Sequence, residues 1–345
     1  MGEKSLITQS KIAELAGVSR STVERVLNNR GDVNEETRKR ILEIAQKHDY
    51  QPNRAGQTLV IRQKNITIGC IIIEADNPFY AELNKGIEEK AKEFQTYGIK
   101  VIVRKAPFAA EAQIKEIDYL LEQNINALVI QPIVNAPVTD KIKSLEEKGI
   151  PVVTMNTDIP DHDSQFCYVG NDFYLCGKTA ANLMTLFTGG KCTIGIITGF
   201  ADAKSHYDRI DGFKDYIKDY PDMKVIDVVE NQDDDLESYH ITKELIEKHP
   251  EIDAIFIVAG GVYGAGRAIK SFSNRHFKTI SFDEMPETRK LVKDGTILAT
   301  ICQQPVRQGE LAMSVLFDYF VDGKKPDDNR VYTDIQIKVA ANIDQ

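Results

Sequence analysis

The sequence predicts an α/β protein with two doubly wound lobes, preceded by a small all-helical head and a hinge helix. Three observations favour this class: a helix-turn-helix pattern near residue 17, a long alternation of strand and helix patterns from residue 66 onward, and a charge asymmetry between the two parts. The expected divisions are a head at 1–50, a hinge helix and linker at 51–64, and a two-lobed domain at 65–345.

Residues 8–28 predict two helices that meet at a turn. Thr8 can cap a helix that runs to about Ala16, and Ser19 can cap a second helix after the turn at Gly17. In both caps a hydroxyl oxygen satisfies an otherwise unpaired backbone N–H. Two helices joined by a short turn that contains glycine are typical of a helix-turn-helix.

The second helix presents a polar face that suits DNA. Arg20, Ser21 and Arg25 fall on this face, and an arginine can donate two hydrogen bonds to a guanine edge in the major groove. Alone, such arginines are more often solvated surface charges, but the surrounding pattern favours contact with bases. Residues 1–64 also carry 12 Lys and Arg against 8 Asp and Glu, whereas the remainder is acidic, which is typical of a dedicated DNA-binding head.

A third helix and a linker follow. Asn34 can cap the helix, and its buried stripe is expected at Ile41, Leu42, Ile44 and Ala45. Pro52 then ends it, and Asn53 can cap a further helix that is too short to be stable alone. The apolar residues at 59–61 argue against a plain tether, so we expect a linker that is helical only when it is docked.

From residue 66 onward, buried-strand and amphipathic-helix patterns alternate. Strands are expected at 66–73, 99–104, 127–131, 151–155, 192–198, 224–229, 253–258, 278–281 and 297–302. Helices are expected at 79–94, 110–123, 136–148, 172–187, 205–219, 236–248, 262–272, 286–293 and 305–320. This is too many units for one ordinary sheet, so two lobes are expected, with a ligand cleft between the carboxyl ends of their strands.

Several other classes find no support in the sequence. The polar start and the lack of a long apolar run predict a cytoplasmic protein without membrane contact, and five scattered cysteines predict reduced structural thiols. No metal or cofactor is expected, because the six histidines lack metal-ligand pairing and the glycines at 260–266 lack the dinucleotide spacing. The acidic run 233–235 lacks the spacing of a calcium loop and predicts a solvated turn. No nucleophile–base arrangement is evident, so no enzyme and no catalytic residue are predicted.

A dense set of motifs spans residues 8–61. It comprises Ile12-Ala13, Ala16-Gly17-Val18-Ser19, Thr22-Val23, Arg25-Val26-Leu27-Asn28, Val33, Thr37-Arg38, Tyr50 and Pro52-Asn53. With this set, the segment resembles the DNA-binding head of the lactose-repressor (LacI-type) family of bacterial transcription regulators. Residues 66–345 are similar to the type I periplasmic sugar-binding fold that these regulators use as an effector domain.

The resemblance implies a homodimeric, ligand-responsive transcription regulator, most simply a repressor. Its partners would be double-stranded operator DNA with two half-sites and a small carbohydrate-like effector. The direction of the response stays open, since an effector can either release the regulator from DNA or tighten its binding. Two other classes stand as alternatives: a solute-binding receptor of a sugar transporter, which the head disfavours, and a sugar-active enzyme, which lacks a catalytic constellation.

The resemblance also implies roles in DNA binding. Arg20, Ser21 and Arg25 match base-reading positions, and further head positions match contacts to DNA or its backbone: Ser10, Ser19, Thr22, Asn28 and Asn53. Leu59 matches a hinge leucine that wedges into the minor groove at the operator centre. Two departures stand out, namely Glu24 where a serine is usual and Gly56-Gln57-Thr58-Leu59 in place of an alanine-rich hinge.

In the effector domain, the resemblance implies a set of ligand positions at strand ends. They are Asn77, Phe79, Tyr80, Asn156, Asp158, Asp172, Arg209, Asp283 and Gln303. Such a set suits a polyol, because carboxylates accept hydrogen bonds from hydroxyls while arginine and glutamine donate them. Asp172 can equally be a helix cap, and the aromatic pair can pack beneath the cleft, with Phe79 expected to be the more exposed ring.

One departure concerns the size of the ligand. The asparagine expected after the strand at 253–258 is absent, and Ala259-Gly260-Gly261 stands there. The sequence therefore predicts a cleft less suited to a ribose-like ligand and with room for something larger.

Overall fold

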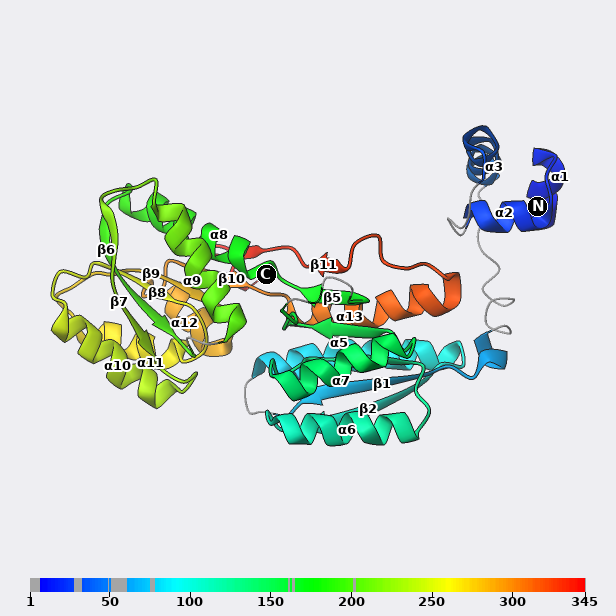
Figure 1. Ribbon diagram of the computed structural model, residues 1–345. Coiled ribbons are helices and arrows are strands. Elements are labelled where there is room, and N and C mark those ends of the chain that lie inside the picture. Colours follow the sequence, from blue (N-terminus) through cyan, green and yellow to red (C-terminus); the bar gives the residue numbers. More distant parts are fainter. Residues whose placement is uncertain are drawn as a thin grey trace.

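The computed structural model describes residues 7–27, 33–48, 50, 61–74, 78–160, 162, 165–200 and 203–344. These residues form a three-helix head and two α/β lobes, each with a six-stranded sheet (Figure 1). Four residues with expected roles lie outside the described part: Asn28, Asn53, Leu59 and Asn77. Of the expected linker, only residues 61–64 are described, and they are helical.

The head consists of α1 (Gln9–Ala16), α2 (Arg20–Leu27) and α3 (Glu35–Lys47). The expected caps are present: Thr8 accepts a hydrogen bond from the Lys11 N–H, Ser19 from the Thr22 N–H and Asn34 from the Glu36 N–H. The core joins side chains of all three helices: Ile12, Ala13, Ala16, Val23, Val26, Ile41 and Ala45. The prediction for Leu42 was wrong, because this side chain is 46% exposed and points away from that core.

The N-terminal lobe is built mainly from the first half of the two-lobed part. Its elements are β1 (Thr67–Ile73), α5 (Pro78–Thr96), β2 (Lys100–Ala106), α6 (Ala110–Glu122), β3 (Ala127–Ile130), α7 (Ala136–Glu147), β4 (Val152–Met155) and β5 (Cys167–Gly170). The chain returns later with α13 (Pro305–Phe317), the π-helical turn η1 (Asp318–Asp322) and β11 (Arg330–Tyr332). The parallel sheet has the order β11-β5-β4-β3-β1-β2.

The C-terminal lobe repeats this plan. Its elements are α8 (Phe173–Thr188), β6 (Cys192–Thr198), α9 (Lys204–Ile217), β7 (Met223–Glu230), α10 (Asp235–Lys248), β8 (Ala254–Ile257), α11 (Val262–Ser271), β9 (Lys278–Phe282), α12 (Pro286–Lys293), β10 (Ala299–Cys302) and β12 (Gln336–Lys338). The order is β12-β10-β9-β8-β6-β7, and β12 alone runs antiparallel to its neighbour. Both lobes are therefore doubly wound, as predicted, with helices on both faces of each sheet.

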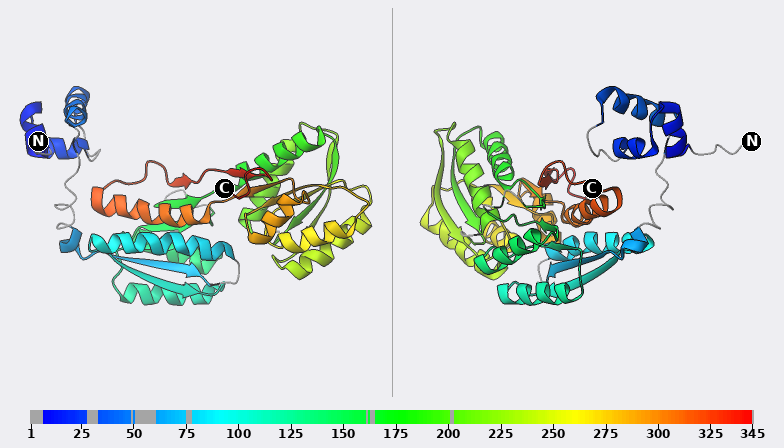
Figure 2. Two further views of the ribbon diagram at one scale, coloured as in Figure 1. Left: turned by 180° about the vertical axis from the view of Figure 1, so that it is seen from behind. Right: turned by 45° about the vertical axis from the view of Figure 1, so that its right-hand side comes forward.

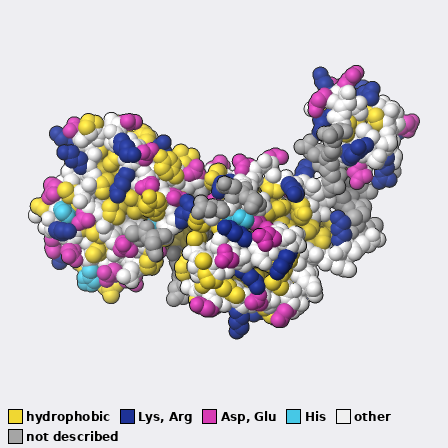
Figure 3. All heavy atoms as spheres, viewed as in Figure 1, with side chains coloured by type: hydrophobic (Ala, Val, Ile, Leu, Met, Phe, Trp, Pro, Cys, Tyr) yellow, Lys and Arg dark blue, Asp and Glu magenta, His cyan; other side chains and the backbone are white. Residues whose placement is uncertain are grey.

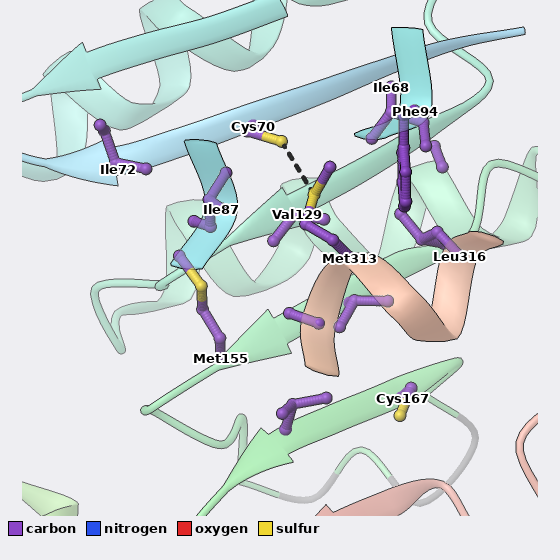
Figure 4. Close-up of a cluster of buried hydrophobic side chains, with 14 of the residues drawn as sticks. Ile68, Cys70, Ile72, Ile87, Phe94, Val129, Met155, Cys167, Met313 and Leu316 are labelled. Carbon is purple, nitrogen blue, oxygen red and sulfur yellow. Dashed lines mark hydrogen bonds between the residues drawn. The ribbon is translucent and has the colours of Figure 1, made fainter. Parts of the chain in front are cut away.

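A late helix completes the core of the N-terminal lobe. Side chains of α13 such as Met313 and Leu316 pack with α5 against β1, β3, β4 and β5 (Figure 4). The Cys70 thiol lies 3.6 Å from the Met313 sulfur inside this cluster. The opposite face of the sheet is covered by α6 and α7, so the apolar strands are buried on both sides.

Three short segments connect the lobes: those from β5 to α8, from β10 to α13 and from β11 to β12 (Figures 1 and 2). Buried hydrogen bonds join these three crossings to one another. The Gln308 side chain donates to Asn171 Oδ1 and to the Gln303 carbonyl, both at 2.9 Å. The Thr333 N–H donates to the Gly170 carbonyl at 2.8 Å. We call Asn171, Gln303, Gln308 and Thr333 the hinge network, because these four buried side chains belong to or contact all three crossings.

The structure departs from the sequence prediction in the short strands. The expected loop between 155 and 172 contains β5, and the unassigned C-terminal region contains β11 and β12. The helix expected at 305–320 is α-helical only to Phe317 and continues as the π-helical turn. Strands of three or four residues are too short for a periodic pattern, and β11 and β12 pair with strands far away in the sequence.

Candidate DNA-binding head and interlobe cleft

The head exposes the polar face of α2. Ser19, Arg20, Ser21 and Arg25 are exposed, as is Ser10 on α1, whereas Thr22 is partly buried. Val23 and Val26 face the core, so the helix directs its polar side chains outward. Figure 3 shows Lys and Arg side chains on the outer surface of the head, interspersed with acidic ones.

Local hydrogen bonds hold the start of α2. Ser19 Oγ lies 2.8 Å from both the Ser21 and the Thr22 hydroxyl oxygens. The Arg25 guanidinium donates to the Ser21 carbonyl and to the Thr22 hydroxyl, both at 3.3 Å. These bonds lie at the surface, so a DNA partner can replace them at a small free-energy cost.

In each lobe, a polar residue with a left-handed backbone follows a central strand. Asn156 follows β4 with φ of 60°, and Asp283 follows β9 with φ of 66°. The Asn156 N–H donates to the carbonyl of Val169 in β5, and the Asp283 N–H to that of Ile301 in β10, both at 2.9 Å. The two lobes therefore place Asn156 and Asp283 at equivalent positions, where asparagine and aspartate tolerate this backbone better than most residues.

Asp283 is held by its neighbours on β10. Gln303 Nε2 donates to Asp283 Oδ1 at 2.7 Å, and the Thr300 hydroxyl donates to the Asp283 carbonyl at 2.9 Å. Burial raises the pKa of the Asp283 carboxyl; Arg209 and the Gln303 hydrogen bond oppose that rise, while Asp233 adds to it. The Gln303 side chain is 5% exposed, and its Oε1 has no hydrogen-bond partner among the described residues. This pair therefore has the capacity to bind additional donors.

Arg209 supplies a cation beneath this pair. It is 3% exposed, donates to the Val258 carbonyl at 2.7 Å, and stacks its guanidinium over the rings of Phe173 and Phe282 at 4.8 and 4.1 Å. Burial lowers its pKa, and the nearby Asp283 acts most strongly against that change. Its Nε has no hydrogen-bond partner in the described part of the chain, so a donor is available here.

Close packing of two helices sets the position of Arg209. A Cβ atom added at Gly177 on α8 would lie 2.0 Å from the Arg209 carbonyl oxygen, and one added at Gly212 on α9 would lie 2.0 Å from that of Tyr174. Only glycine allows the two helix backbones to approach this closely. The sequence therefore places Arg209 at a fixed depth behind the ends of the strands.

Tyr80 is the residue of the N-terminal lobe that responds to these charges. Burial raises the pKa of its hydroxyl, Asp233 and Asp283 of the other lobe add to the rise, and the Gln131 side chain opposes it. The Tyr80 hydroxyl therefore experiences the negative charge of two carboxylates of the C-terminal lobe. The predicted order of exposure was wrong: Phe79 is 5% exposed and packs in the core, with its ring edge-to-face against Tyr80 at 5.7 Å.

Asp158 and Asp172 line a side pocket of about 400 Å³ between the lobes. Asp158 binds Arg330 at 3.1 Å and Gln165 at 2.9 Å. Asp172 accepts a hydrogen bond from the Leu175 N–H at 2.8 Å, so its helix-cap role is present. Both carboxylates are thus engaged by protein groups, as Asp283 is by Gln303.

The structure adds one residue that the sequence analysis missed. Asp233, predicted as part of a solvated turn, lies after β7 with φ of 57°, and its Oδ1 accepts a hydrogen bond from the Gly260 N–H at 2.8 Å. It occupies space near the position where an asparagine was expected after β8. The available signal was its place three residues after β7, in the loop at the carboxyl end of that strand.

The five cysteines are free and buried. Burial raises the pKa of the Cys70, Cys167 and Cys176 thiols to about 12, so they carry no reactive thiolate near neutral pH. Across the described residues, no three side chains of the kinds that bind metals are grouped as a metal site. No described helix is long and apolar enough to cross a membrane.

Comparisons with known proteins agree with both parts of the fold. Residues 10–53 match the family "Bacterial regulatory proteins, lacI family", and residues 68–325 match "Periplasmic binding protein domain". The chain therefore belongs to the lacI family of bacterial regulators and carries a periplasmic-binding-protein domain as its two-lobed part. It is a DNA-binding regulator, and this confirms the resemblance noted in the sequence.

Individual relatives cover most of the chain. A ribose import binding protein of Bacillus subtilis is 29% identical over 279 residues, covering 80% of this chain and 86% of that protein. A ribose operon repressor of Halalkalibacterium halodurans is 27% identical over 314 residues, covering 87% of this chain and 86% of that protein. A solved ABC transporter solute binding protein from Burkholderia graminis, in complex with D-arabinose, has a TM-score of 0.74 and 25% identity, covering 81% of this chain and 97% of that one.

Proposed function

We propose that this protein is a homodimeric repressor whose two heads bind a roughly palindromic operator and whose interlobe cleft binds a pentose-like sugar. The observation that carries the proposal is the union, in one chain, of a head with exposed Arg20 and Arg25 and a cleft where Asp283, Gln303 and Arg209 meet. A two-fold protein suits a two-fold site, since each half-site then receives one head.

In the head, we assign base contacts to Arg20, Ser21 and Arg25. Contacts to the DNA backbone are assigned to Ser10, Ser19, Thr22, Asn28 and Asn53. Leu59 is assigned the role of a minor-groove wedge that bends the operator. The exposure of the α2 face supports the first assignment.

In the cleft, we assign sugar contacts to Tyr80, Asn156, Arg209, Asp283 and Gln303, and also to Asn77, which lies outside the described residues. The buried atoms Asn156 Oδ1, Arg209 Nε and Gln303 Oε1 have no hydrogen-bond partner among the described residues, which supports this, because a sugar hydroxyl both donates and accepts. Phe79 is assigned a supporting role beneath Tyr80, while Asp158 and Asp172 are assigned to the rim of the side pocket. The names of the ribose and arabinose proteins among the relatives support a pentose.

The hinge network connects the cleft to the crossings between the lobes. Gln303 donates to Asp283 through its side chain and accepts from Gln308 and Thr333 through its carbonyl. A sugar that draws on Asp283 and Gln303 therefore acts on a residue shared with the crossings between the lobes. Lobe closure around the sugar then shifts the equilibrium between two arrangements of the dimer.

The test is a selection of operator sequences from random oligonucleotides by the full-length protein. We expect a two-fold symmetric sequence, strong salt dependence, and a change in affinity when D-ribose or D-arabinose is added. Leu59→Ala should weaken binding to the selected operator far more than binding to unrelated DNA. Lack of any sequence preference would contradict the repressor and favour a solute-binding receptor instead.

A further inference from the structure

Asp233 brings a second carboxylate to the sugar cleft. It follows β7 with a left-handed backbone and reaches across the end of β6 to β8, where its Oδ1 accepts the Gly260 N–H at 2.8 Å. Asn231 supports the same loop, because its side chain donates to the Gly260 carbonyl at 2.9 Å and its Oδ1 accepts the Asp233 N–H at 3.0 Å. The carboxylate is thus held in place on the protein side.

Two glycines make the space for this carboxylate. A Cβ atom added at Gly199, after β6, would lie 2.2 Å from Asp233 Oδ1, and one added at Gly260, after β8, would lie 3.0 Å from the same atom. Asp233 therefore covers the ends of three neighbouring strands. The room expected from the missing asparagine after β8 is partly filled by Asp233, so the cleft is not simply enlarged.

The charges of Asp233, Asp283 and Arg209 do not sum to zero. The charge of Arg209 lowers the pKa of Asp283, and the charges of Asp283 and Asp233 both raise the pKa of Arg209. Two carboxylates thus share one guanidinium. Asp233 accepts from the Gly260 N–H and Arg209 donates to the Val258 carbonyl, so both side chains lie at the carboxyl end of β8, where ligands bind in this class of fold.

The free hydrogen-bonding atoms are mainly acceptors. Among the described residues, Asp233 Oδ2 and Asp283 Oδ2 have no hydrogen-bond partner, and neither has Gln303 Oε1 on a side chain that is 5% exposed. The orientation of the Gln303 amide is set, because its Nε2 donates to Asp283. Acceptors need donors, and sugar hydroxyls supply them, whereas a phosphate dianion or a carboxylate brings further acceptors.

We infer that Asp233 makes this cleft selective for uncharged polyhydroxyl ligands and excludes phosphorylated and acidic sugars. The inference rests on the proposed sugar-binding function and narrows it to one chemical class. A ligand anion that comes to about 7 Å from the Asp233 carboxylate would, at an effective dielectric constant of ~20, bind about 50-fold more weakly than an uncharged ligand. Asp233 therefore contributes a discrimination of that order against an anionic ligand.

The experiment compares four ligands by isothermal titration of the full-length protein: D-ribose, D-arabinose and their 5-phosphates. Wild-type protein should bind at least one free sugar about 50-fold or more tightly than its phosphate. Asp233→Asn keeps an oxygen for the Gly260 N–H and should narrow that ratio about 10-fold or more. Asp219→Asn removes the same charge from an exposed site on the same lobe and should leave the ratio unchanged.

The outcomes separate the proposed sugar-binding function from the charge selectivity inferred for Asp233. A wild-type protein that binds a 5-phosphate as tightly as the free sugar, or more tightly, overturns the charge selectivity and leaves a sugar-responsive regulator. An unchanged ratio in folded Asp233→Asn protein overturns the role of Asp233. Absence of binding by all four ligands contradicts the proposed pentose and removes the inference with it. The wild-type comparison needs no variant, so it decides the selectivity even where Asp233→Asn fails to fold.

Discussion

Replacing Asp283 with asparagine separates ligand binding from folding. The amide side chain would keep the shape of the carboxylate, and asparagine tolerates the left-handed backbone at this position, whose φ is 66°. The variant would also keep an oxygen to accept the 2.7 Å hydrogen bond from Gln303 Nε2 and leave the Thr300 bond to the main chain intact. What the variant loses is the negative charge.

The charge acts in opposite directions on stability and on affinity. A hydrogen bond to a charged group contributes about 1.5–3 kcal/mol, against about 0.5–1.5 kcal/mol for a neutral one. In the free protein, that loss is offset by relief from burying the carboxylate, so we expect the free energy of unfolding to change by less than ~1 kcal/mol. In the complex the sugar hydroxyls lose a charged acceptor, so affinity should fall by about 1–3 kcal/mol, or roughly 5- to 150-fold.

The pH dependence gives a second measurement. Because burial raises the pKa of Asp283, the folded protein holds this proton at pH values where the unfolded chain has released it. The contribution of Asp283 to stability is therefore present at low pH and declines as pH rises from the ordinary pKa of aspartate toward the raised one. Sugar affinity should change in the other direction across the same interval, since the ionised carboxylate is the better acceptor.

Urea unfolding and isothermal titration, each across pH, measure both effects. In Asp283→Asn protein the stability slope should flatten, and Asp219→Asn serves as the matched control at an exposed site. Sugar affinity that stays unchanged in Asp283→Asn would refute the placement of this residue in the cleft. A loss of several kcal/mol in stability would instead show that the charge supports the fold.

Two further predictions concern the head and the helix packing behind the cleft. Arg25→Ala should weaken binding to the selected operator by ~1–3 kcal/mol and binding to unrelated DNA by less. Arg40→Ala, a change at an exposed position on α3, is the control and should weaken binding to the two DNAs equally. If Arg25→Ala also weakened binding to the two DNAs equally, a base contact by Arg25 would be refuted. Gly177→Ala should lower stability by ~1–3 kcal/mol and weaken sugar binding, because its Cβ would lie 2.0 Å from the Arg209 carbonyl oxygen. Calorimetric melting checks this against Thr179→Ala, and a melting temperature equal to that of the wild type would refute the close approach of α8 and α9.

The head illustrates what local sequence signals can predict. Its caps at Thr8, Ser19 and Asn34 were identified correctly because a cap depends on a hydrogen bond within two or three residues. Leu42 was assigned to the core incorrectly, since helical spacing marks a face but not the edge of the partner that covers it. The long strands and helices were also predictable, because their periodic patterns extend over many residues.

The sugar cleft was predictable only in part. The family resemblance proposed Asn156, Asp283 and Gln303, which directly follow strands in the structure, and Arg209, which lies within α9 and not at a strand end. It did not indicate that Asp158 pairs with Arg330. That pairing depends on β11, a three-residue strand that carries Arg330. Arg330 lies 172 residues after Asp158 in the chain.

Taken alone, the sequence determined the class of protein, the helical head and the two doubly wound lobes, because each depends on patterns that repeat along neighbouring residues. Only the tertiary structure decided which polar groups are free for a ligand. It buried Phe79 and engaged Asp172 as a helix cap. It also brought Asp233 over Gly199 and Gly260. The physical reason is that the direction of a loop side chain is set by the ends of several packed strands, and these lie far apart in the sequence.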